Sequence, residues 1–212
     1  MTCNSVFKQQ ITTERELRDL LGFPSDLVVN KAIQELDEHC RHFIAKSPFI
    51  CISTANAAGA CDASPRGDEA GFVHIIDNHH LVIPERPGNR RLDSILNILE
   101  NPSIGIIFMI PGLEETLRVN GKACVIQDEQ LLEQMKAKGK QPKLGIGVQV
   151  EECYIHCGKA FKRSALWNPA TWVSAEERPH IPSILASHAN MKGITSKEVE
   201  RSLQDTYENR LY

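Results

Sequence analysis

Two adjacent arginines, Arg90 and Arg91, stand where a helix is predicted to begin, after a short apolar strand and a Pro/Gly turn (81–88). A helix N-terminus carries unpaired backbone N–H groups and a partial charge of about +0.5. The two arginines add fixed charge and further donors where most helices carry Asp or Glu. The pattern predicts a site for an external anion, most commonly phosphate. The alternative is that both guanidinium groups are solvated or pair with Asp93 and Glu85.

The segments around this site are mostly strand-like. Helical periodicity over Asp26–Ala45 predicts one long helix with a buried face, and Asp128–Lys138 is expected to form a short polar helix. Closely spaced apolar runs with few helical crossovers favour an antiparallel barrel over a parallel α/β sheet. The predicted strands are Pro48–Ala55, Ala60–Gly67, Phe72–Asp77, Leu81–Pro84, Ser103–Ile110, Thr116–Ile126 and Lys143–Cys157.

The composition narrows the class of protein. The 212 residues carry a net charge of −3, which argues against a general nucleic-acid surface. No apolar run approaches the roughly 20 residues that a membrane helix needs, and the N-terminal segment lacks an apolar signal-peptide core. We therefore expect a cytoplasmic protein with no membrane partner. An odd number of scattered cysteines, seven including Cys3, predicts reduced and mostly buried thiols.

No metal site is predicted. The most suggestive motif is CYIHC, in which Cys153 and Cys157 are separated by four positions of a predicted strand. Such residues point the same way but lie about 13 Å apart, which is too far for one zinc ion.

Four motifs occur in order over residues 48–168: DASPRG, LVIPERPGNRRLDSILNILENPSIGIIF, ETLRVNGKA and HCGKAFKRSALW. In this order and spacing they resemble the pyridoxamine 5′-phosphate oxidase-like family, and within it a subgroup of mostly unassigned activity. The resemblance implies an FMN-binding split barrel, that is, a mainly β antiparallel split β-barrel with flanking helices. It also implies a homodimer with two FMN molecules at the subunit interface.

The same resemblance divides the chain into three parts of a single domain. Residues 1–47 would form N-terminal helices packing on the barrel, 48–168 the FMN-binding split barrel, and 169–212 a helical extension. Within the extension, 181–193 and 195–212 are both expected to be helical, the second with a capping box of Thr195 and Glu198.

The family's phosphate-binding side chains lie on a strand and at the start of a helix. By resemblance, Arg66 of the SPRG motif is the strand cation, and Asn89, Arg90 and Arg91 form the cluster at the helix start. Asn89 would cap the helix. The basic helix start inferred from the residues alone falls at the same place.

The resemblance also implies contacts with the flavin ring. Ile83 and Pro84 match the strand end beside the ring, and Thr116 falls where the family often has a Gln that contacts it. The segment after the barrel, which closes the site from the partner subunit, would use its matching side chains Lys159, Ser164 and Trp167.

We therefore expect an FMN-dependent oxidoreductase acting on a small-molecule substrate. No Ser–His, Cys–His or carboxylate pair stands out as catalytic, which suits chemistry carried by a cofactor. The basic pair that grips substrate phosphate in the vitamin B6 oxidases is not matched convincingly by Arg210-Leu211, so B6-phosphate oxidation is not expected. The alternatives are a non-catalytic protein that binds flavin, F420 or haem, and a flavin-free dimer.

Overall fold

A computed structural model describes residues 6–212, so Cys3 lies outside the described residues. The chain divides into two compact units, one ending at Ala32 and the other spanning Ile33–Tyr212. The first unit contains helix α1 (Glu14–Leu21) and the short helix α2 (Asp26–Asn30). A capping box begins α1, because the Thr13 side chain accepts from Glu16 N–H and the Glu16 carboxylate accepts from Thr13 N–H.

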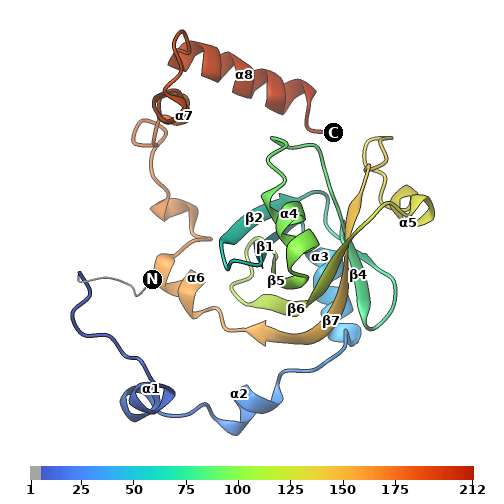
Figure 1. The fold of residues 1–212 in the computed structure, drawn as a ribbon, viewed down its shortest axis with the longest axis vertical. Coiled ribbons are helices and arrows are strands. Elements are labelled where there is room, and N and C mark those ends of the chain that lie inside the picture. Colours follow the sequence, from blue (N-terminus) through green and yellow to red (C-terminus); the bar gives the residue numbers. More distant parts are fainter. Residues whose placement is uncertain (1–5) are drawn as a thin grey trace. The chain divides into compact units, whose positions relative to one another are not determined.

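The second unit is built on one seven-stranded antiparallel sheet with flanking helices (Figure 1). The strand order is β2-β1-β5-β6-β7-β4-β3. The predicted fold class is therefore confirmed. The strand bounds are β1 (Phe49–Ala55), β2 (Cys61–Gly67), β3 (His74–Ile75), β4 (His80–Pro84), β5 (Ser103–Met109), β6 (Thr116–Ile126) and β7 (Gly145–His156).

A bulge bends the longest strand pair. The β6–β7 register shifts between Asn120 and Gly121. A Cβ atom on Gly121 would lie 2.0 Å from the carbonyl oxygen of Gln149, so only glycine allows this approach. The bend lets a long strand follow a curved sheet.

The predicted helix over Asp26–Ala45 is wrong, because the chain forms α2 and then α3 (Glu38–Lys46). Between them, Ile33 and Cys153 exchange two backbone hydrogen bonds, which holds this segment extended against β7. The side chain of Asp37 then caps α3 by accepting from Cys40 N–H at 2.8 Å. Sheet pairing and a local cap thus override the helical periodicity.

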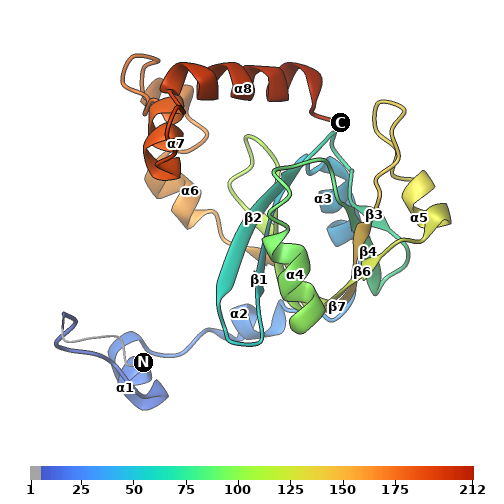
Figure 2. The same cartoon turned by 45° about the horizontal axis from the view of Figure 1, so that its top comes forward.

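The core of the second unit lies between the sheet and helices α3 and α4 (Asp93–Glu100). Cys40 and Ile44 of α3, and Ile95 and Ile98 of α4, join the apolar side chains of the sheet in one buried cluster. Helix α4 lies against β1 and β2 (Figure 2). A smaller cluster of Val82, Leu132 and Met135 anchors α5 (Glu129–Glu133), which is shorter than predicted.

The cysteines are only partly as expected. The six in the described range are free thiols, and Cys40 and Cys153 are buried with their sulfur atoms 3.8 Å apart. The prediction that the thiols are mostly buried is wrong, because Cys61, Cys124 and Cys157 are exposed. Cys61 and Cys124 lie on solvent-facing strand positions, and Cys157 follows the end of β7.

Four short elements follow β7 along the chain. They are α6 (Lys159–Ser164), the 3₁₀ turn η1 (Pro169–Thr171), α7 (Ile181–Ala189) and α8 (Ser196–Asn209). Thr195 and Glu198 form the predicted capping box of α8. Within residues 6–212, no helix combines the length and apolar character needed to span a membrane.

Candidate functional site

The strand cation Arg66 lies on the core-facing side of β2. It is paired across the sheet with Ile50, a fully buried residue of β1. Its guanidinium forms an ion pair with Glu85, which directly follows β4, and the two side chains are only 16% and 15% exposed. The Nε atom of Arg66 is buried and has no hydrogen-bond partner among residues 6–212. Leaving a buried donor unpaired costs about 1–3 kcal/mol, so this atom is suited to an acceptor from outside the chain.

A second ion pair lies beside the first. Arg86 Nε donates to Asp68 Oδ2 at 2.6 Å, and the two side chains are 17% and 2% exposed. We call Arg66, Asp68, Glu85 and Arg86 the β2–β4 ion-pair cluster. Because β2 and β4 lie toward opposite ends of the sheet order, the cluster joins the two sides of the curved sheet.

The loop from Glu85 to Leu92 differs from the prediction. Helix α4 begins at Asp93, so Arg90 and Arg91 precede the helix rather than opening it. Arg90 and Leu92 adopt left-handed backbone conformations, with φ of 62° and 59°. Each such conformation is unfavourable for a residue with a side chain and prevents helical propagation through the loop.

The predicted cap is also wrong, because the Asn89 side chain accepts from Arg91 N–H at 3.0 Å instead of capping α4. Arg91 takes the alternative partner named above: its Nε lies 2.8 Å from Asp93 Oδ2. This hydrogen bond and the Asp93 charge raise the pKa of Arg91. Arg90 is exposed and no ion pair of the described range includes it.

The N-terminus of α4 has no side-chain cap. It lies over the same face of β2 as Arg66, since Ser94 in its first turn donates to the Asp62 carboxylate. The uncapped start of α4 and the unpaired Nε of Arg66 therefore lie over the same face of β2, with Asp62 and Arg66 four strand residues, or about 13 Å, apart. Each of these two groups is suited to an anionic oxygen such as that of a phosphate.

The positions matched to the flavin ring are less accessible. Ile83 is 1% exposed and belongs to the main apolar core. Pro84 is buried at the end of β4, opposite Gly145 of β7. Thr116, the first residue of β6, is 4% exposed and pairs with His156. Because these side chains are buried within one chain, a ligand beside the strand ends would contact their backbone rather than the side chain of Ile83.

The α6 segment forms a separate group. Trp167 stacks on Phe161 with ring centroids 5.7 Å apart, and its indole N–H donates to the Leu113 carbonyl at 2.9 Å. Ser164 Oγ donates to the Phe161 carbonyl, and Lys159 is exposed. In the part of the chain that the structure describes, Ser164 contacts its own helix, and Trp167 contacts Phe161 and the turn at Leu113. These contacts do not join Arg66 or the 85–92 loop within one chain.

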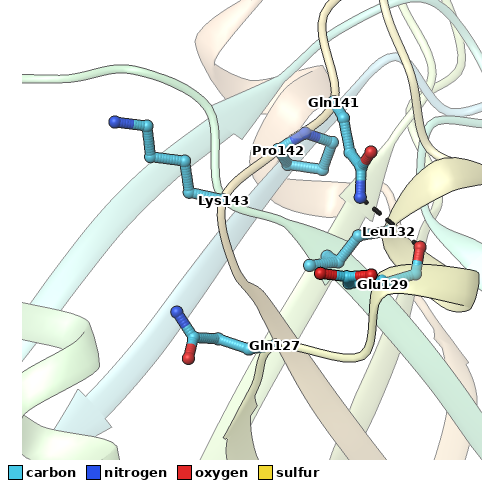
Figure 3. A pocket seen from close by; sticks show the side chains of 6 residues that line it. All are labelled: Gln127, Glu129, Leu132, Gln141, Pro142 and Lys143. Carbon is cyan, nitrogen blue, oxygen red and sulfur yellow. Dashed lines mark hydrogen bonds between the residues drawn. The ribbon is translucent and has the colours of Figure 1, made fainter.

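A surface hollow of about 490 Å³ lies elsewhere, beside α5 (Figure 3). It is lined by Gln127, Glu129, Leu132, Gln141, Pro142 and Lys143. The lining is mostly polar, and Gln141 donates to the backbone carbonyl of Glu129. None of the residues predicted to bind a cofactor lines this hollow.

The model of the pyridoxamine 5′-phosphate oxidase family matches residues 36–157, more than half of the chain. The chain belongs to this family. The match runs from the residue before the cap of α3 to the residue after β7, so it contains the β2–β4 ion-pair cluster and the 85–92 loop. Among curated protein sequences, none is significantly similar to this chain.

Solved structures with similar folds share little sequence with this family member. HupZ of Group A Streptococcus is 17% identical over 56% of this chain and 92% of its own, with a TM-score of 0.47. A protein of Lactobacillus delbrueckii described as a pyridoxamine 5′-phosphate oxidase is 18% identical over 57% and 95%, with a TM-score of 0.45. HutZ, the haem storage protein of Vibrio cholerae, is 15% identical over 57% and 94%, with a TM-score of 0.42.

Sequence reasoning missed the carboxylates that hold the cations of this site. Glu85 was considered only as a partner of the exposed arginines, whereas it pairs with Arg66. Asp68 and Arg86 were not singled out, although each stands within two residues of a predicted site residue. Their closeness in sequence to Arg66 and Pro84 is the signal that could have identified Asp68 and Arg86.

Proposed function

We propose that this protein binds FMN through its phosphate and acts as an FMN-dependent oxidoreductase on a small-molecule substrate. The observation that carries the proposal is the buried, unpaired Nε of Arg66, on the side of the barrel where the uncapped N-terminus of α4 lies. Membership of the pyridoxamine 5′-phosphate oxidase family supports the same cofactor.

The chain's own residues then bind and orient. Arg66 supplies a buried donor and charge, and Arg90 and Arg91 add exposed charge from the loop. Asn89 fixes the loop through Arg91 N–H. FMN, when bound, accepts or gives hydride or electrons, and no side chain is assigned as a general base.

We also propose that the working form is a homodimer. Leu96 and Leu99 of α4 are 53% and 69% exposed, and Leu92, which precedes the helix, is 43% exposed. Exposed apolar side chains gathered on and beside one helix are suited to a protein interface. In a dimer, Lys159, Ser164 and Trp167 would close the cofactor site of the other subunit. Sedimentation equilibrium of the purified protein tests this, and a monomer at micromolar concentration would contradict it.

The proposal is tested by titrating the protein with FMN and with riboflavin, which has the same ring but lacks the phosphate. If the phosphate site is correct, FMN should bind at least about 100-fold more tightly, since two charge-assisted hydrogen bonds together contribute about 3 kcal/mol or more. Equal affinities would contradict the site. Binding of haem or of F420, with no affinity for FMN, would instead support the alternative of a non-FMN binding protein.

A further inference from the structure

Tyr212 joins the segment after α8 to the β2–β4 ion-pair cluster. Its hydroxyl donates to Asp68 Oδ1 at 2.7 Å. Its ring lies under the guanidinium of Arg86, 6.0 Å from ring centroid to Cζ, which is within cation–π range. Lys140 Nζ, from the turn before β7, donates to the backbone oxygen of Tyr212. Three segments distant in sequence therefore hold this one residue.

The hydroxyl of Tyr212 is one of the donors that surround the buried carboxylate of Asp68. The side chain of Asp68 is 2% exposed and accepts from Arg86, from Tyr212 and from Glu69 N–H. Burial alone would raise the pKa of Asp68, but the Tyr212 hydroxyl, Glu69 N–H and Arg86 outweigh it and lower that pKa. Without the Tyr212 hydroxyl, the Asp68 carboxylate loses one of its three donors.

The residues that Tyr212 touches are directly connected to the candidate phosphate site. Asp68 is two residues after Arg66, and Arg86 follows its partner Glu85. Arg86 is also the second residue of the loop that carries Arg90 and Arg91. The position of this loop therefore depends on the contact between Asp68 and Arg86.

We propose that Tyr212 is a positioning residue of the cofactor site. Through Asp68 and Arg86 it fixes the start of the 85–92 loop, and helices α7 and α8 form a strap that brings it there (Figures 1 and 2). This assignment rests on the proposed FMN function, and it gives a role to the helical extension outside the family match.

The test compares Tyr212→Phe with Tyr207→Phe. The first variant removes only the hydroxyl that donates to Asp68. The second makes the same change on α8 at a tyrosine that is 62% exposed, so it controls for the substitution itself. Hydrogen exchange is measured on the FMN-free proteins, and FMN affinity and the phosphorus NMR resonance of bound FMN are measured on the complexes.

In Tyr212→Phe, we expect faster exchange at the amides of 85–92, including Glu85 N–H, which donates to the Leu144 carbonyl. We expect FMN affinity to fall about fivefold, with a shifted phosphorus resonance, because the loop is less well fixed before binding. Tyr207→Phe should match the unaltered protein in all three measurements. A merely structural contact would change thermal stability without moving the phosphorus resonance.

Two results would overturn the assignment. Unchanged hydrogen exchange in the 85–92 loop of Tyr212→Phe would show that Tyr212 does not fix this loop. Faster exchange with unchanged FMN affinity and phosphorus resonance would show that Tyr212 has no role in the cofactor site. Failure of the unaltered protein to bind FMN would overturn the proposed function instead. In that case the exchange measurement on FMN-free protein still decides whether Tyr212 fixes the loop.

Discussion

The arginines of the candidate site occupy two contrasting environments. Arg66 lies on the core-facing side of β2 with its side chain 16% exposed, and its partner Glu85 is 15% exposed. Arg90 and Arg91 lie on an exposed loop, where the Arg91–Asp93 pair is 73% and 42% exposed. A buried cation already has its position fixed by packing, whereas exposed ones retain rotamer freedom that is lost on binding. For the proposed FMN site, we therefore expect Arg66 to provide specificity and the loop to provide additional attraction.

The largest effect is expected from Arg66→Met. This change leaves the Glu85 carboxylate buried without a partner, which should reduce the free energy of unfolding by about 3 kcal/mol. It should also weaken FMN binding about 100-fold, because it removes the buried donor. Urea denaturation and FMN titration measure the two effects separately.

The matched control is Glu85→Gln, which breaks the same ion pair but keeps Arg66. Its stability should fall, while its FMN affinity should stay the same or rise, because the guanidinium loses a competing anion. A Glu85→Gln protein that loses FMN as strongly as Arg66→Met would show that only the integrity of the barrel matters.

A smaller effect is expected from the double variant Arg90→Ala/Arg91→Ala. FMN affinity should fall about 10-fold at low salt and less at high salt, since exposed charges are screened. The free energy of unfolding should change by less than about 0.5 kcal/mol, as is usual for surface substitutions. Undiminished FMN affinity at low salt would remove the loop from the phosphate site.

The second ion pair gives a prediction about pH. The folded pKa of Asp68 lies below the unfolded value of about 3.9, so its ionised form stabilises the folded protein above about pH 4. That stabilisation is lost as the pH falls through the folded pKa. Asp68→Asn should therefore be about 1–2 kcal/mol less stable at pH 7, with a smaller difference at pH 3. Urea denaturation at both pH values measures this, and a pH-independent difference would contradict it.

The smallest effect is expected from Trp167→Ala. Since Trp167 packs on Phe161 and hydrogen-bonds to the Leu113 carbonyl, its removal leaves the arginines of the candidate site in place, and FMN affinity should fall only a few-fold, by roughly 1 kcal/mol. Fluorescence of bound flavin should change if Trp167 closes the site of a partner subunit. An unchanged emission spectrum would remove Trp167 from the site.

The sheet could be predicted from the sequence because each strand is a local pattern. β6 alternates buried and exposed residues along most of its length, and β5 is a continuous apolar run ended by Pro/Gly. The break between α2 and α3 could not be predicted in this way. It depends on backbone pairing between Ile33 and Cys153, which are 120 positions apart, and no periodicity encodes that contact.

In the candidate site too, some features follow from neighbouring residues in the sequence and others from contacts between residues far apart. The basic character of 85–92 is a local feature of the sequence, whereas the predicted start of the helix at Arg90 is wrong. The Arg66–Glu85 pair and the Tyr212–Asp68 hydrogen bond join residues 19 and 144 positions apart, and no local pattern encodes them. Distant pairings therefore decide which arginine is buried and which remains exposed.

The most direct test of the central claim is the absorbance spectrum of the purified protein, followed by heat release and chromatography of any chromophore. We expect a flavin spectrum and release of FMN, in stoichiometric amount after reconstitution if it is lost during purification. A protein that stays colourless in excess FMN, or that carries haem instead, would contradict FMN binding.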